Sequence, residues 1–66
     1  MNVTDTITAD QIQPGDQILV NGIDPLENVT VEDFGSAIKV QGFSWNTGDI
    51  AVYLMDPSKE VDLWSI

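Results

Sequence analysis

The chain has 66 residues, which is room for one small hydrophobic core, and it contains neither cysteine nor histidine. Disulfides, the commonest zinc ligands and the usual general base near neutral pH are therefore missing, so we expect no enzyme, no metal and no cofactor. Eleven acidic residues against two lysines give a net charge of −9, which argues against direct binding to nucleic acid or to an anionic membrane.

The chain shows no export or membrane signal. No basic segment followed by an apolar run opens it, and no apolar stretch approaches the ~20 residues of a membrane helix. A hydrophobic content of 42% is also too high for a chain that charge alone keeps disordered. We therefore expect a folded cytoplasmic protein.

The N-terminal part has the weakest pattern. We expect residues 1–6 to be loosely ordered, and Thr6–Ile12 fits either a short strand or one helical turn. After a turn at Pro14–Asp16, the run Gln17–Val20 is typical of a strand. It ends at Asn21–Gly22, a dipeptide suited to positive φ angles.

The middle of the chain predicts a β-hairpin. Apolar and polar residues alternate over Asn28–Asp33 and again over Ala37–Gln41, on either side of a turn at Phe34–Ser36. The valines and isoleucines of both runs share one phase, which is the pattern of strands with one buried and one wet face.

Two more strands follow. A loop around Trp45–Asp49 leads to Ile50–Met55, and a turn at Asp56–Lys59 precedes Val61–Trp64. The inward phase of the hairpin continues through the even-numbered residues of Ile50–Met55, although the opposite face of that run is apolar too. The predicted core is Ile18, Val20, Val29, Val31, Ile38, Val40, Ile50, Val52, Leu54, Val61 and Leu63.

Five short strands and no long helix predict an all-β fold, a single domain over residues 1–66. Closing the sheet into a five-stranded barrel would remove its exposed edges. A long first connection, two hairpins and a tight turn before the last strand favour an SH3-like barrel. An OB-like barrel is the alternative, but it usually carries a helix between its third and fourth strands, and the loop over residues 42–48 is too short for one.

The phrase ITADQIQPGDQI, Ile7–Ile18, followed by valine-rich hairpins, resembles small uncharacterised SH3-like β-barrel proteins of actinobacteria and their bacteriophages. The resemblance covers most of the chain. It implies the fold and a phage context, in which the protein would act in the host cytoplasm, and it carries over no activity and no functional residue.

The apolar face opposite the predicted core is the candidate binding site. If Leu54 and Leu63 face the core, their neighbours Tyr53, Met55 and Trp64 point outward, where paired strands would bring them together. Aromatic and methionine side chains dominate many protein interfaces, and Trp45 and Phe43 would extend the patch. An acidic rim would come from Asp56, Glu60 and Asp62.

A different role for this face is also open, because the N-terminal segment could cover it with Ile7 and Ile12 as a lid. The pattern favours a small acidic, non-enzymatic protein-binding module that docks through the patch, one form of which is a phage-encoded regulator or inhibitor of a host protein. The first alternative is a structural protein that pairs with itself or joins a virion. The second is a DNA mimic, since Glu60 and Asp62 lie about 6.6 Å apart on a strand, near the spacing of successive phosphates.

Overall fold

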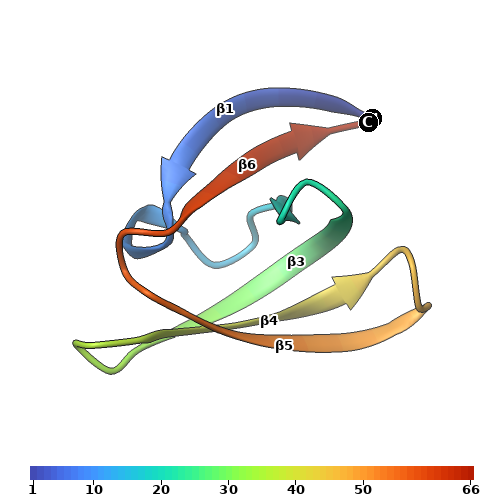
Figure 1. Ribbon diagram of the computed structural model, residues 1–66. Coiled ribbons are helices and arrows are strands. Elements are labelled where there is room, and N and C mark those ends of the chain that lie inside the picture. The colour runs from blue at the N-terminus through green and yellow to red at the C-terminus, as the bar shows by residue number, and fades with distance from the viewer.

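The structure, a computed structural model, describes residues 1–66 and consists of six β-strands and one 3-10 turn (Figure 1). The elements are β1 Asn2–Thr8, η1 Ala9–Gln11, β2 Ile18–Val20, β3 Asp24–Asp33, β4 Ile38–Ser44, β5 Asp49–Met55 and β6 Glu60–Ser65. All strand pairs are antiparallel and form one sheet in the order β1-β6-β2-β3-β4-β5. The all-β prediction is confirmed. The sheet has six strands and is not closed, since β1 and β5 are its two edges.

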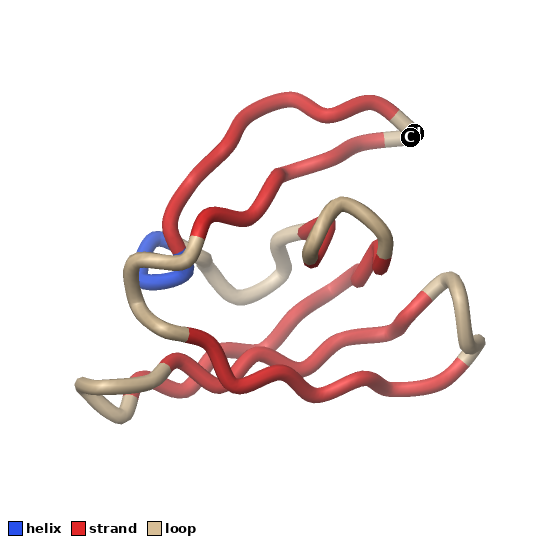
Figure 2. The backbone as a smooth tube through the Cα atoms, viewed as in Figure 1, coloured by secondary structure: helices blue, strands red, loops and turns tan.

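The sheet is strongly bent. The β1–β6 pair arches over the meander β3–β4–β5, and the short strand β2 joins the two parts (Figure 2). Between them lies one core cluster, Ala9, Ile12, Ile18, Val20, Leu26, Val29, Ile38, Val40, Met55 and Val61. The structure has no helix whose length and apolar character would let it cross a membrane.

The N-terminal segment is more regular than its sequence pattern suggests. We expected residues 1–6 to be loosely ordered, but Asn2–Thr6 belong to β1, which pairs with β6 from Asn2 opposite Ser65 to Thr8 opposite Glu60. Thr6–Ile12 contains both of the elements that we weighed, the end of β1 and the turn η1. Ile12 is buried and Ile7 packs against the core cluster, so this segment completes the core.

Strand β5 faces the opposite way from our expectation. Its even-numbered residues Ile50, Val52 and Leu54 are exposed, Leu54 by 70%, whereas Ala51, Tyr53 and Met55 pack toward the core. The predicted core is therefore wrong for β5. For the other strands it is right, with Val31 and Leu63 only partly buried against the cluster and the rest fully buried.

Candidate functional site

The predicted binding residues of β5 and β6 lie mostly inside the molecule. Met55 is 4% exposed and Trp64 is 3% exposed, so the expectation that they form an open patch is wrong. Tyr53 is half-buried, and its phenol donates a hydrogen bond to the carboxylate of Asp24 on β3. That bond, followed by burial, raises the pKa of the Tyr53 phenol above its ordinary value.

The structure brings two of the predicted residues into contact. The rings of Trp45 and Trp64 meet edge to face, with centroids 4.8 Å apart and an interplanar angle of 75°. The indole N–H of Trp64 donates to the carbonyl of Ile18 at 3.0 Å. Trp64 alternates with Val61 and Leu63 along β6, which places it on the opposite face of that strand. It is buried there and packs against Trp45, which is itself 45% exposed.

The predicted acidic rim consists of residues that largely stabilise the fold. Asp56 accepts hydrogen bonds from the backbone N–H and the hydroxyl of Ser58, at 2.9 and 2.6 Å, which lower the pKa of its carboxyl. Asp62 accepts a hydrogen bond from the hydroxyl of Thr6 at 2.7 Å and so helps to join β6 to β1. Glu60 is exposed and stands opposite Thr8 at the start of β6.

The surface that is exposed and apolar lies instead on the outside of the β3–β4–β5 meander. Register places its side chains in three rows across the strands. We call this surface the outer face, and its rows are Glu27–Phe43–Ile50, Thr30–Gln41–Val52 and Glu32–Lys39–Leu54. The β5 column is wholly aliphatic, the β4 column is mixed, and the β3 column carries two glutamates. The outer face therefore changes from apolar at the sheet edge to acidic about 10 Å away, two strand spacings further in.

The two edges of the sheet differ in how they could accept another strand. The β1 edge has an irregular register between Val3 and Asp5, a feature that discourages further pairing. By contrast, β5 pairs with β4 in unbroken register over seven residues and has no lysine, proline or bulge of its own. Its unpaired backbone groups thus border an aliphatic stripe, which is the arrangement that accepts an added strand.

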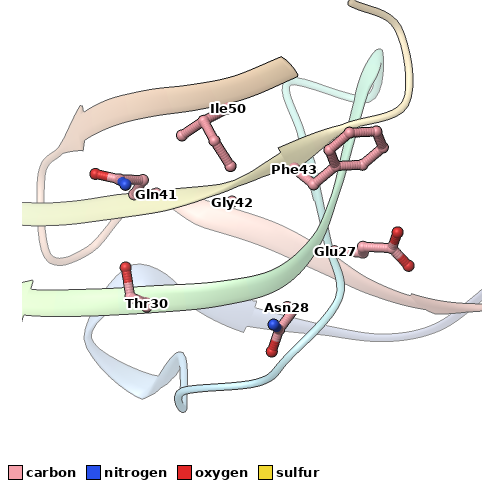
Figure 3. A pocket seen from close by; sticks show the side chains of 7 residues that line it. All are labelled: Glu27, Asn28, Thr30, Gln41, Gly42, Phe43 and Ile50. Carbon is pink, nitrogen blue, oxygen red and sulfur yellow. The ribbon is translucent and has the colours of Figure 1, made fainter. Parts of the chain in front are cut away.

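A small notch interrupts the outer face. Between Glu27 and Thr30 the register of β3 shifts, so that Asn28 and Val29 both stand opposite Gly42 of β4. Asn28 takes a φ of 53° and is exposed, while Val29 turns into the core. The notch has a volume of about 140 Å³ and is lined by Glu27, Asn28, Thr30, Gln41, Gly42, Phe43 and Ile50 (Figure 3).

Gly42 is required at this bulge. A Cβ on residue 42 would lie 2.9 Å from Cγ1 of Val29 and 3.1 Å from the carbonyl oxygen of Glu27. Val29 therefore occupies the space that a side chain at this β4 position would need, so a larger residue at position 42 would force Val29 or the backbone to shift.

Only part of the outer face is predicted by the sequence pattern. Phe43 was expected near a binding patch, whereas Ile50, Val52 and Leu54 were assigned to the core because they continue the phase of the preceding hairpin. The apolar character of both faces of Ile50–Met55 was the available signal that one face would stay exposed. No group of three or more acidic side chains lies in a geometry that could hold a metal ion.

No family model, no curated protein and no solved structure matches the chain.

Proposed function

We propose that the chain is a small non-enzymatic protein-binding module that docks a basic partner through its outer face. The observation that carries the proposal is the aliphatic stripe of Ile50, Val52 and Leu54 on an edge strand whose other face already fills the core. These three side chains contribute nothing to the packing of the cluster. Contiguous apolar surface of this kind on a small domain usually marks an interface.

The unpaired edge of β5 indicates how the partner would dock. An extended segment of the partner can pair with the free backbone groups of β5, and its alternate side chains can cover the stripe from Ile50 to Leu54. Phe43 lies opposite Ile50 on β4 and enlarges the apolar contact by one ring. The main-chain pairing supplies affinity, and the side chains select the sequence of the segment.

Charge favours a basic partner. The chain carries a net charge of −9 and contains a single ion pair, Lys39 with Glu32 at 3.6 Å on the surface. Its field therefore attracts cationic proteins and speeds their encounter with the outer face. A second copy fits less well, since antiparallel pairing of β5 with itself brings Asp49 of one copy toward Asp56 of the other and joins two strongly acidic molecules.

A second part of the proposal concerns the relationship of this fold to SH3-like barrels. We propose that the chain is an open, six-stranded form of the SH3-like barrel, related to the small phage and actinobacterial proteins that its N-terminal phrase resembles. Support comes from the β3–β4–β5 meander and from the tight turn that Asp56 and Ser58 form before the last strand.

A peptide-display selection on the immobilised chain tests the function. We expect the selected peptides to combine alternating apolar residues with lysine or arginine. Their binding should be lost in the variant Ile50→Thr/Val52→Thr/Leu54→Thr, which keeps β-forming residues on the strand. The control variant Ile23→Ser/Phe34→Ser removes exposed apolar side chains elsewhere and should bind normally.

Equal binding by both variants, or peptides without a basic excess, would contradict the proposal. Sedimentation of the wild-type chain at several concentrations distinguishes this function from that of a self-pairing structural protein. Self-pairing through β5 would appear as a dimer, and the threonine variant would abolish that dimer.

A further inference from the structure

Glu27 is one of two acidic residues whose carboxylates have no hydrogen-bond or ion-pair partner, and it is the one that lines the notch. All eight aspartates accept hydrogen bonds through their carboxylates, and Glu32 pairs with Lys39. Glu60 is the remaining glutamate without a partner, and it is exposed to water. Glu27 is only partly exposed and lines the notch. An unpaired carboxylate can gain a charge-assisted hydrogen bond from an incoming cation.

The other polar side chains of the notch are also free to bind. Asn28, Thr30 and Gln41 form no side-chain hydrogen bond within the protein, and each offers an oxygen that can accept one. With Glu27, these side chains place several possible acceptors along the margin of the notch, with the Glu27 carboxylate and the Gln41 amide at opposite ends of it (Figure 3). No lysine lines the notch to compete for them.

One wall of the notch is aromatic. Phe43 stands directly opposite Glu27 across the β3–β4 pair, and Ile50 follows in the same row on β5 (Figure 3). The ring of Phe43 is exposed, so a planar cation can stack on it while bonding to the carboxylate. The apolar side chain of Ile50 suits the methylene groups of a long side chain.

From these observations we propose that the notch receives an arginine side chain of the partner. The inference rests on the proposed function and specifies one contact of it. A guanidinium has five donors in a plane, which matches a set of several acceptors beside a ring better than the compact ammonium of lysine. A notch with a volume of about 140 Å³ suits the end of one side chain.

Other occupants fit the notch less well. A divalent cation prefers six or more oxygens with several carboxylates, and the notch supplies one carboxylate. An anion would face Glu27 and the overall negative charge. A neutral side chain would bury the carboxylate further and leave it unpaired.

The test is an NMR titration of the chain with N-acetyl-arginine amide at constant ionic strength. We expect the backbone amide signals of Thr30, Gly42 and Phe43 to shift, with millimolar affinity. The neutral isostere N-acetyl-citrulline amide should leave them in place, and the lysine amide should bind more weakly. Glu27→Gln should weaken arginine binding at least about tenfold, as the loss of one charge-assisted hydrogen bond predicts.

Glu60→Gln is the matched control, since it removes the other unpaired glutamate outside the notch and should bind arginine like the wild type. An unchanged amide spectrum away from residue 27 shows that Glu27→Gln keeps the fold. Shifts of equal size with citrulline, no shift with arginine at any soluble concentration, or equal weakening by both glutamine variants would overturn the arginine assignment.

The two proposals can fail separately. If display peptides bind through Ile50–Leu54 but arginine amide does not bind, the notch assignment is wrong and the proposed function stands. If arginine amide binds with the expected dependence on Glu27 while no peptide depends on the stripe, the notch stands and the docking mode is wrong.

Discussion

The phenol of Tyr53 donates its hydrogen bond to Asp24, across a strand that separates the two residues in the sheet. The hydroxyl of Ser44 donates to the other oxygen of the same carboxylate at 2.6 Å. One aspartate at the start of β3 thus ties together the last residue of β4 and the middle of β5. The link holds Tyr53 toward the interior and leaves its neighbours Val52 and Leu54 on the outer face.

Removing this link should destabilise the domain without emptying its core. We predict that Tyr53→Phe lowers the free energy of unfolding by about 1.5 kcal/mol, the loss expected for a partly exposed hydrogen bond to a charged group. Urea unfolding measures the change. Thr4→Val, which removes an exposed hydroxyl bond of 3.3 Å to the Leu63 carbonyl, is the control and should change stability less. Identical unfolding curves for Tyr53→Phe and the wild type would show that the link is inert.

Alkaline pH should weaken the same link. Because the folded state raises the pKa of Tyr53, it favours the protonated phenol, and the contribution to stability is complete below the unfolded value of about 10. It is then lost as the pH rises through the higher folded pKa. Tyr53 is the single tyrosine, so phenolate absorbance reports on it alone. The stability difference between wild type and Tyr53→Phe should shrink above about pH 10, and a constant difference would refute this reading.

The two faces of β5 should respond differently to substitution. Leu54→Thr on the outer face should change the free energy of unfolding by no more than about 0.5 kcal/mol, since Leu54 is 70% exposed. Met55→Ala, on the core face of the same strand, should cost about 2–5 kcal/mol. Thermal unfolding of both variants measures the two changes in stability. A large loss of stability for Leu54→Thr would instead place Leu54 in the core, as the sequence pattern predicts.

Trp64 should behave as a core residue. We predict that Trp64→Ala costs about 3–5 kcal/mol, because it opens a cavity beneath Trp45 and leaves the Ile18 carbonyl without its indole donor. A domain of this size has little stability to lose, so the variant should be largely unfolded by circular dichroism. Trp45→Ala should have a smaller effect. Native-like melting of Trp64→Ala would place Trp64 in a surface role.

Strand phase was predictable where one face is polar. In β6 the acidic Asp62 separates Val61 from Leu63, and both of these apolar residues pack at the core cluster as alternation indicates, although Trp64, which shares the parity of Asp62, is buried as well. In β5 both parities are apolar, and the phase is decided by partners from elsewhere in the chain, namely Asp24 for Tyr53 and Ile38 for Met55. Periodicity carries no information about such partners.

The missed features follow the same logic. β1 is rich in threonine, which has the β-branched shape of a strand residue but gives no apolar signal. Pro25 reads as a turn residue, yet it lies within β3 and is buried opposite Leu19 of β2. The notch depends on the register shift at Asn28, which only the pairing of β3 with β4 reveals.

The pairing of Asn2 with Ser65 has a consequence for how the chain reaches this structure. The β3–β4–β5 meander closes through short turns, whereas β1 and β6 must meet from opposite ends of the chain and lose far more loop entropy. We therefore expect the meander to form in the folding transition state and β1 to dock after it, so that φ-values are high around Val40 and near zero around Ile7. High φ-values in β1 would reverse this order. Until β1 docks, β6 is an unpaired edge strand, and the long sequence separation of the β1–β6 contacts makes folding slow for so short a chain.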